Sequence, residues 1–338
     1  MRTLKPPSAP TLEMVGAHAG VSRATVSRVV NGSPKVSEEI AITVRAAIAE
    51  LGYVPNRAAR SLASKQAHAI ALVVPEDMTR LFGDLYLATI IVGINDRLQE
   101  SDYVLNLMVA STDPHGKTMR YLQGGNVDGA LVVSHHTADT FLSTLTSTIP
   151  VVFGGRPAVG IEGGYVVDVD NVAGSRTGTE RLITTGRKRI ATITGPKNMR
   201  VGSEREAGFL AALADAGLTP GPVVEGDFTL GGGATAMRTV LEQDPTVDGI
   251  FVASDSMAAG AMTVLRSMGM RVPTDIAMVG YDDSEAARTT EVPLTTVRQP
   301  SEEMGAAMAD ILIAVLNGDE DRPRTTILPT QLIIRASA

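Results

Sequence analysis

The stretch from Thr11 to Asn31 constrains the fold of this chain more than any other segment. It reads TLEMVGAHAGVSRATVSRVVN, with two short helical patterns on either side of Gly20, a residue that suits a tight turn. We expect Thr11 to cap a first helix that runs to about His18, and Ser22 to cap a second one. Two short helices joined in this way occur both in ordinary surface hairpins and in DNA-reading helix-turn-helix modules.

The second helical pattern, from Arg23 to Val30, has an apolar side and a polar side. Val26, Val29 and Val30 form the apolar side. The polar side gathers hydrogen-bond donors for phosphates and base edges, which are Ser22, Arg23, Thr25, Ser27 and Arg28. A helix with one apolar stripe and such a polar face fits the major groove of DNA, with its N-terminal residues at the bases.

The charge is distributed unevenly along the chain. The 338 residues carry a net charge of −7. Residues 1–66 hold nine Lys and Arg against four Glu, a net charge of +5, so the remaining residues carry −12. A basic head on an acidic body indicates a small DNA-binding module joined to a larger part that does not contact phosphate.

Several classes of protein are disfavoured by composition. The sequence has no cysteine, which excludes disulfides, thiolate metal sites and a cysteine nucleophile, and which suits a reducing cytoplasm. The first ten residues, MRTLKPPSAP, lack the apolar core of a signal peptide, and no apolar run is long enough to cross a bilayer. We therefore expect a cytoplasmic protein without a membrane contact, with residues 1–10 as a disordered arm.

Two further segments complete the N-terminal part. Ser37 is placed to cap a third helix that runs to Leu51 and carries an apolar stripe, so it should close the core of the small domain. Asn56 can cap a short segment that ends near Ser64. A helix of this length is marginal in water without packing partners, which makes the segment a linker in the free protein.

From Ala69 onward short apolar strands alternate with helical stretches, which predicts parallel sheets covered by helices on both faces. So many strands usually split into two sheets, and hence into two lobes with a cleft between them. The expected strands are Ile70–Val74, Val104–Val109, Ala130–Ser134, Val151–Phe153, Tyr165–Val169, Ile190–Thr194, Gly249–Ala253, Ile276–Val279 and, near the end of the chain, Gln331–Ile334. The expected helices are Leu85–Glu100, Gly174–Thr185, Glu204–Ala216, Ser256–Met268 and Ser301–Asn317.

Two motifs show a specific resemblance. The run VSRATVSRVVN from Val21 to Asn31 and the run YVPNRAA from Tyr53 to Ala59 resemble the lac repressor family of bacterial transcription regulators. The resemblance covers nearly the whole chain after Pro10. It implies a small all-α helix-turn-helix head and an α/β, two-lobed body of the periplasmic-binding-protein type, built of parallel sheets that the chain connects three times.

The resemblance also implies domain limits and partners. The head would span residues 11–55, a hinge helix or linker 56–67, and the effector-binding and dimerisation domain 68–338. The N-terminal lobe would comprise 68–168 and 300–325, and the C-terminal lobe 169–298 and 327–338. The three crossings would lie near Asp168–Asp170, Arg298–Gln299 and Thr325–Leu328. The implied partners are a second copy of the chain in a homodimer, a pseudo-palindromic operator, and a sugar-like effector.

By the same resemblance, the DNA contacts come from the head and the hinge. Arg23, Ala24 and Arg28 would face base edges, and Thr11, Ser22, Thr25, Ser27 and Asn31 would hold phosphates. In the hinge, Leu62 would be an apolar wedge in a central minor-groove step. The other expected hinge contacts are Asn56, Arg57, Ala59 and Arg60.

Polar residues after the strand ends predict a ligand site, because open α/β sheets bind ligands beyond the carboxyl ends of their strands. An Arg, an Asp and an aromatic face suit a hydroxylated ligand. The resemblance places five residues at the effector, which are Arg156, Arg205, Phe228, Asp282 and Gln299. Tyr86, at the start of a predicted helix, and Ser254, after a predicted strand, complete the expected set of seven. Ser254 stands where many family members have Asn, and the loop Glu76–Leu85 is longer than usual, so the family pattern does not fix the ligand.

Other features point to no chemistry. Gly231-Gly232-Gly233 lacks the Lys-Ser/Thr of a phosphate loop and should be a loop or the start of a helix. His135 and His136 have no third ligand at a suitable spacing, so we expect solvated histidines and no metal site. We expect no cofactor and no catalytic set. Three alternatives stay open at this point, namely a solute-binding protein, an enzyme with a DNA-binding head, and a nucleobase-responsive regulator.

Overall fold

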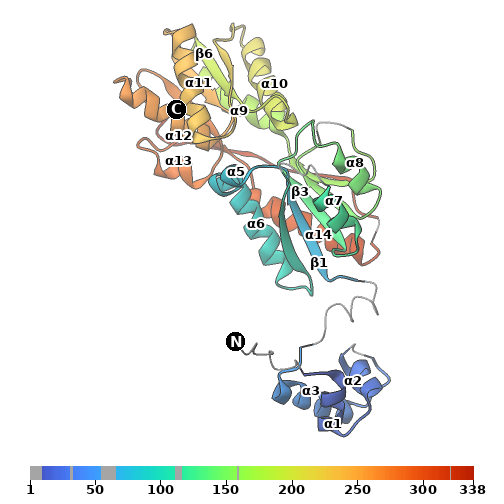
Figure 1. Cartoon of the computed structure of the whole chain (residues 1–338). Helices are drawn as coiled ribbons and strands as arrows, with labels where there is room; N and C mark the ends of the chain where they lie inside the picture. Colours follow the sequence, from blue (N-terminus) through green and yellow to red (C-terminus); the bar gives the residue numbers. More distant parts are fainter. Residues whose placement is uncertain (1–9, 31–32, 55–65, 111–115, 158–159, 320) are drawn as a thin grey trace, which may run out of the picture. The chain divides into compact units, whose positions relative to one another are not determined.

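The computed structural model describes residues 10–30, 33–54, 66–110, 116–157, 160–319 and 321–338 (Figure 1). The chain divides into two compact units, Met1–Ala67 and His68–Ala338. We refer to the first as the head and to the second as the body.

The head contains three helices around a small apolar core. They are α1 (Leu12–Ala19), α2 (Arg23–Val30) and α3 (Glu38–Leu51). The first and third agree with the sequence prediction to within one residue at each end, and the second matches it. The core is formed by one side of each helix and by Tyr53, which follows α3. Its buried members are Val15, Val26, Val44, Ala47 and Tyr53.

Helices α1 and α2 meet through a turn at Gly20. This residue has φ +67°, in the left-handed region that glycine adopts without strain. Inside α1, a Cβ on Gly16 would lie 2.8 Å from the carbonyl oxygen of Val21, so only glycine lets the turn approach this closely. The turn therefore sets the angle at which α2 leaves the small core.

The body contains two six-stranded sheets. Sheet A runs in the order β11 (Thr325–Leu328), β5 (Tyr165–Val169), β4 (Val151–Gly154), β3 (Gly129–Val133), β1 (Ala69–Val74) and β2 (Val104–Val109). Sheet B runs in the order β12 (Gln331–Ile333), β10 (Thr295–Arg298), β9 (Ala277–Asp282), β8 (Gly249–Val252), β6 (Ile190–Thr194) and β7 (Val223–Glu225). Neighbours are parallel except β10 and β12, which pair antiparallel. The two lobes expected from the sequence are built on these sheets.

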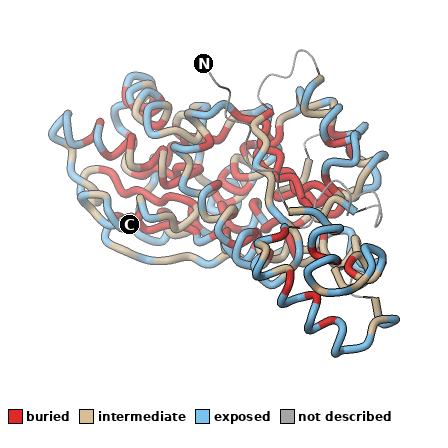
Figure 2. Tube along the Cα trace, turned by 60° about the horizontal axis from the view of Figure 1, so that its bottom comes forward, coloured by how far each residue is buried: buried red, intermediate tan, exposed pale blue. Residues whose placement is uncertain are grey.

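Helices cover both sheets, and the buried residues form the interior of each lobe (Figure 2). Helices of the sheet A lobe are α5 (Met78–Gly83), α6 (Leu85–Leu98), α7 (Lys117–Gln123), α8 (Phe141–Thr146) and α14 (Ser301–Leu316). Helices of the sheet B lobe are α9 (Asn171–Thr184), α10 (Arg200–Asp215), α11 (Leu230–Gln243), α12 (Asp255–Ser267) and α13 (Glu285–Thr289). Although α14 comes late in the sequence, it packs against α6 and the strands of sheet A.

The chain passes between the lobes three times. The first two crossings, at Asp170 and at Gln299–Pro300, lie where the sequence predicts them. The third lies at Pro329–Thr330, and not within Thr325–Leu328. Ile327 and Leu328 pair with Asp168 and Val169, so all four residues belong to sheet A. The pattern of charged and apolar residues at the end of the chain does not show that the crossing lies about two residues later than expected.

Some elements were not predicted from the sequence. The short strands β7, β10 and β11 carry no long apolar run, whereas β12 lies within the strand expected at Gln331–Ile334. The segment Glu76–Leu85, expected as a loop, contains α5, whose first turn is capped by the Asp77 side chain accepting from the Arg80 amide at 2.9 Å. Helix α10 begins at Arg200, so Arg205 lies more than one turn inside the helix and does not open it. The three glycines at 231–233 lie at the start of α11, as expected.

Candidate functional site

The candidate DNA-reading face of the head is the polar side of α2. The Ser22 hydroxyl accepts from the Thr25 amide at 3.1 Å, which caps the helix as the sequence predicts. Val26 lies fully buried on the opposite side. Ser22, Arg23, Ala24 and Arg28 are exposed, whereas Thr25 and Ser27 are half-buried. The side chains expected at base edges are therefore accessible.

Arg23 already has a partner in the head. Its Nε lies 2.8 Å from a carboxylate oxygen of Glu13 on α1, and both side chains are about two-thirds exposed, at 67% and 63%. Exposed ion pairs of this kind are weak, so a base edge or a phosphate can replace Glu13 at little cost. Thr11, expected at a phosphate, uses its hydroxyl to accept from the Met14 amide at 3.3 Å.

Six of the expected DNA contacts lie outside the described residues. These are Asn31, Asn56, Arg57, Ala59, Arg60 and Leu62.

The second group of functional residues lines a cavity between the lobes of the body. The cavity contains about 710 Å³ of space that no atom fills, part of it open to solvent. All seven residues expected at the effector contribute to its wall, namely Tyr86, Arg156, Arg205, Phe228, Ser254, Asp282 and Gln299. Except for Arg205, which lies in the second turn of α10, they are at or just beyond the carboxyl ends of strands or begin the next helix, which is where ligands bind in parallel sheets.

Arg205 is the most strongly held residue of the cavity. Its Nε donates to Asn171 Oδ1 at 3.0 Å, one terminal nitrogen donates to the Ala253 carbonyl at 2.6 Å, and the other donates to Gln299 Oε1 at 3.3 Å. Its guanidinium carbon lies 3.6 Å from the centre of the Tyr281 ring. The residue is only 3% exposed. A planar cation fixed on so many sides presents its remaining N–H groups to a ligand in a set direction.

Asp282 forms the acidic counterpart. Arg205 Nη1 and Gln299 Nε2 each approach its Oδ1 to 3.4 Å. Burial raises the pKa of Asp282 well above the usual carboxyl range, and the Arg205 guanidinium opposes that shift. Asp282 also has φ +109°, a conformation that is rare for any residue but glycine. The surrounding structure therefore holds this carboxyl in a strained position at the cavity.

Strained backbone recurs around the same cavity. Ser134 and Phe228, which also line it, have φ +57° and +63°. Residues held in this region are typical of ligand sites, where the fold determines the position of the side chain. Phe228 packs over Gly195, where a Cβ would lie 2.2 Å from the ring. The ring is thus seated on a backbone position that only glycine leaves open.

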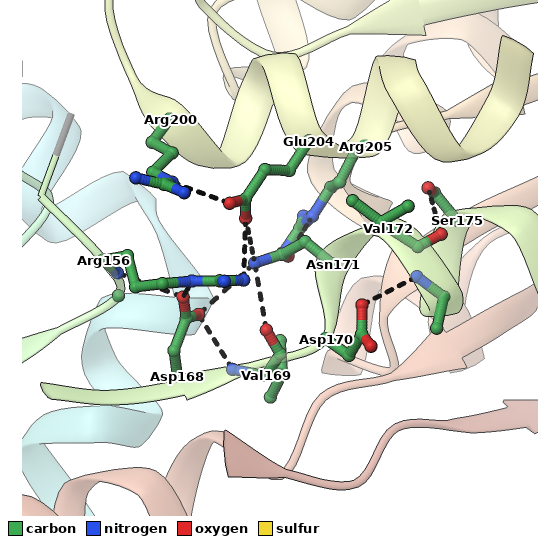
Figure 3. A network of polar contacts seen from close by, with 12 residues as sticks. Arg156, Asp168, Val169, Asp170, Asn171, Val172, Ser175, Arg200, Glu204 and Arg205 are labelled. Atoms are coloured by element: carbon green, nitrogen blue, oxygen red, sulfur yellow. Dashed lines mark hydrogen bonds and ion pairs between the residues drawn. The ribbon is translucent and has the colours of Figure 1, made fainter. Parts of the chain in front are cut away.

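A polar network joins the two lobes at the first crossing (Figure 3). Arg156 follows β4, and its amide and Nε both donate to Asp168 Oδ2, at 3.1 and 2.9 Å. Its terminal nitrogen lies 3.3 Å from Glu204 of the other lobe. Glu204 also accepts from Arg200 at 2.7 Å and from Asn171 at 3.4 Å. Asp168 and Asp170, similar in spacing to a catalytic pair, have separate roles here, since Asp170 caps α9.

Ser254 and Tyr86, which are also expected at the effector, have structural roles in their own helices. Ser254 caps α12 by accepting from the Met257 amide at 3.3 Å, so its hydroxyl hydrogen is the part left for a ligand. Tyr86 lies in the first turn of α6, and burial raises the pKa of its hydroxyl, which keeps it a hydrogen-bond donor.

Sequence reasoning missed several residues of the cavity wall. They include Arg80, Asp84, Asn171, Met199, Arg200 and Glu204. Asp84, the cap of α6, lines the cavity, and burial raises the pKa of its carboxyl. Asn171 follows Asp170 of the first expected crossing, and Glu204 precedes Arg205. Both are polar residues near the start of a helix and beside an expected position, which was the only signal in the sequence. Nothing in the sequence indicated that α5 places Arg80 at the cavity.

The paired histidines are not solvated, contrary to expectation. His135 is 6% exposed and its Nε2 lies 3.1 Å from the Gly155 carbonyl oxygen, and burial lowers its pKa. His136 Nε2 lies 2.9 Å from Glu76, which raises the pKa of His136. The turn after β3 directs both rings inward, which the sequence could not show. Within the described ranges no cluster of three or more His, Cys, Asp or Glu is arranged to hold a metal ion.

No helix among the described residues has the length and apolarity that a membrane crossing requires.

Comparison with known proteins agrees with this architecture. Residues 11–56 match the family described as bacterial regulatory proteins, lacI family, and residues 179–338 match the periplasmic binding protein-like domain. The HTH-type transcriptional regulator CelR of Thermobifida fusca is 45% identical over 333 residues, which are 97% of this chain and 98% of that protein. The ribose operon repressor of Escherichia coli (strain K12) is 34% identical, over 90% of this chain and 92% of its own length.

Two solved structures share the fold. A transcriptional regulator CelR–cellobiose complex has a TM-score of 0.77 at 44% identity, covering 97% of this chain and all of the other. A lac repressor dimer bound to operator and the anti-inducer ONPF has a TM-score of 0.85 at 29% identity, covering 98% and 99%.

The basic helix-turn-helix head, the two-lobed body with its cavity, and relatives matched along almost their whole length lead to one conclusion. The chain belongs to the lacI family of bacterial regulatory proteins, and is a DNA-binding transcription regulator under the control of a small molecule, not an enzyme.

Proposed function

We propose that this protein is a dimeric repressor whose effector is an uncharged disaccharide of the cellobiose type, bound in the cavity of the body. The charge balance of the cavity wall carries the proposal. Its four arginines, Arg80, Arg156, Arg200 and Arg205, share the wall with four acidic residues, Asp84, Asp168, Glu204 and Asp282.

The arginines of the cavity are not free to take an anionic ligand. Arg156 and Arg200 share Glu204, at 3.3 and 2.7 Å, and Arg205 lies 3.4 Å from Asp282. A phosphorylated sugar or a nucleotide would bring its charge close to the carboxylates of Asp168 and Glu204. Hydroxyl groups, in contrast, can accept from a guanidinium and donate to a carboxylate at the same time. The paired charges therefore favour a neutral, hydroxyl-rich ligand.

An aromatic side chain of the cavity wall and the relatives favour the same ligand class. Phe228 offers a flat apolar face for the C–H side of such a ring. The relative CelR was solved as a complex with cellobiose. We assign the effector contacts to Tyr86, Arg156, Arg205, Phe228, Ser254, Asp282 and Gln299.

For the head, we assign the base contacts to Arg23, Ala24 and Arg28, and the phosphate contacts to Thr11, Ser22, Thr25, Ser27 and Asn31. The segment 56–67 serves as the hinge, with Leu62 as the minor-groove wedge and Asn56, Arg57, Ala59 and Arg60 beside it. Sugar binding draws the two lobes together and releases the operator, because a marginal hinge helix needs only a small bias to form or to melt.

The proposal is tested by a thermal-unfolding panel of the full chain with cellobiose, ribose and glucose 6-phosphate. A ligand present at 100 times its Kd adds about 2.7 kcal/mol to the unfolding free energy, which raises Tm by several degrees. We expect cellobiose to give the largest increase and glucose 6-phosphate to give none. The variant Asp282→Ala serves as control and should lose the increase. A larger effect of the phosphorylated sugar would contradict the charge argument.

A further inference from the structure

We propose that Arg80 determines the length of effector that the cavity accepts, by bridging the two lobes with its own side chain and closing the cavity at the Phe228 end. The inference rests on the proposal above that the ligand is a neutral sugar. It concerns a residue of α5, a helix in a segment for which the sequence predicts a loop.

Arg80 is paired with an acidic residue of its own lobe. Its Nε lies 3.2 Å from Glu76 Oε1, and the two side chains are only 12% and 7% exposed. This contact is an ion pair and not a hydrogen bond, because Nε has no hydrogen-bond partner among the described residues. The same Glu76 oxygen accepts from Ser134 at 2.6 Å and lies 2.9 Å from His136 Nε2. These two neighbours hold the Glu76 carboxylate in place, and its charge keeps the Arg80 guanidinium at this end of the cavity.

The far end of the same side chain reaches the other lobe. Arg80 Nη2 lies 3.6 Å from the sulfur of Met199, and the guanidinium carbon lies 5.5 Å from the centre of the Phe228 ring. Both distances are typical of favourable contacts, the second being a cation–π interaction. A short backbone bridge lies in the same region, where the Thr137 amide donates to the Asn198 carbonyl at 2.9 Å. The lobes are therefore joined here through protein groups.

This bridge forms part of the cavity wall. Arg80, Met199 and Phe228 all line the cavity. A sugar ring packed on Phe228 would meet the Arg80 guanidinium at that end, and an additional ring could not pass without breaking the contact. Truncation of Arg80 would remove the wall, while the anchors of the ligand at Arg205 and Asp282 would remain. The result should be weaker closure and a loss of discrimination against longer sugars.

The test compares wild type, Arg80→Ala and Arg80→Lys by titration calorimetry of the full chain with cellobiose and cellotriose. Arg271→Ala is the matched control, because Arg271 is also paired with an acidic residue four positions away, Asp275, but is 71% exposed. We expect wild type to prefer cellobiose, and Arg80→Ala to bind cellobiose about twofold to thirtyfold more weakly while its preference over cellotriose shrinks.

Arg80→Lys should fall between wild type and Arg80→Ala, since lysine keeps the charge but not the planar fork. Arg271→Ala should match wild type. If Arg80→Ala weakens both sugars by the same factor, or neither, the proposed role in specificity is wrong.

A second readout separates this inference from the identity of the effector. The chain has no cysteine, so labels can be placed on the two lobes through Ser147→Cys and Glu242→Cys, both at exposed positions. Distances between spin labels should shift toward open lobes in Arg80→Ala even without sugar. If wild type binds neither sugar but this shift occurs, the proposed effector is wrong and the bridge stands. An unchanged distance distribution would overturn the bridge.

Discussion

The head and the body hold their functional residues in different ways. On α2, the residues assigned to DNA are exposed and make few contacts, as Arg23 shows with its 67% exposed side chain and one ion pair. In the cavity, Arg205 is 3% exposed and bound to four other residues, among them Asp282 and Gln299. Substitutions on the exposed face of α2 should therefore have additive effects on binding, whereas substitutions among the buried, connected residues of the cavity should not.

The difference follows from what each part binds. DNA brings a regular array of charges and base edges to a flat face, so the protein needs exposed donors on a rigid helix. A small neutral ligand must be surrounded, so its contacts have to be buried and satisfied before it arrives. Buried polar groups without partners are costly, and this is why the cavity residues bind one another.

The largest effect should come from Arg205→Ala. The change removes a cation that four neighbours depend on, and leaves Asp282 buried without its counter-charge. We expect sugar affinity to fall by about a hundredfold or more, with part of the loss due to the unpaired carboxyl. Titration calorimetry with cellobiose measures the loss, and operator affinity should change little.

The double variant Arg205→Ala with Asp282→Ala sharpens this result. If the cavity acts as a unit, the second change adds little to the first, and the two losses are far from additive. Additive losses would mean that the cavity residues act as independently as those of the head. This result would contradict the proposed difference between the head and the body.

A smaller effect should come from Arg28→Ala in the head. The exposed side chain lies on the polar side of α2, and its removal should delete the proposed base contact without disturbing the core around Val26. Operator affinity should fall by about tenfold to a hundredfold and sequence preference at one position should relax. Fluorescence anisotropy with matched and substituted duplexes measures both. Thr25→Ala, a phosphate contact, should weaken all duplexes alike, and equal behaviour of the two variants would contradict the assignment.

The seat of Phe228 offers an intermediate test of the cavity. In Gly195→Ala the new methyl group would lie 2.2 Å from the ring, so the ring must move. We expect about a tenfold loss of sugar affinity, comparable to that of Phe228→Ala, because both remove the same apolar face. Calorimetry of the two variants side by side makes the comparison. Wild-type affinity in Gly195→Ala would show that the ligand does not pack on this face.

The smallest effect concerns pH. Asp255 is fully buried beneath the cavity, with Thr296 Oγ1 donating at 2.6 Å and the Ser284 amide at 2.8 Å, and burial raises its pKa to about 7. The protonated form is favoured in the folded state. Its contribution to stability is therefore full below the unfolded pKa, and is lost as pH rises from about 4 toward about 7.

The variant Asp255→Asn cannot ionise at this position. The difference in Tm between the variant and wild type should change steadily between about pH 5 and about pH 7, and then level off. Thermal unfolding across this range measures it. A difference that stays constant with pH would show that Asp255 titrates normally.

The sequence predicted the head better than the cavity. Local patterns determine α1, α2 and α3, since caps such as Ser22 and stripes such as the valines of α2 lie within a few residues of one another. Ser37, although placed as a cap, makes no side-chain cap hydrogen bond. The lobes were predictable as a class, because alternating strands and helices imply parallel sheets, but short strands such as β10 lack a local signal.

The cavity could be predicted only where residues follow strand ends. Asp282 and Ser254 occupy such positions, and resemblance to a family added Arg205 and Phe228. What remained hidden depends on contacts between distant segments. Arg80 reaches Phe228 across 148 positions of sequence, and no periodicity in either segment reports that contact. The inward turn of the two histidines after β3 was hidden for the same reason.

The central claim is that the head reads a specific duplex and that a neutral sugar in the body controls this reading. Selection of duplexes from a randomised pool by the full chain, followed by anisotropy titrations of the enriched duplex with and without cellobiose, tests it most directly. We predict enrichment of a pseudo-palindrome with two half-sites, and a loss of affinity of at least about tenfold when cellobiose is added. Equal binding of the enriched duplex and random competitor, with and without the sugar, would contradict the claim.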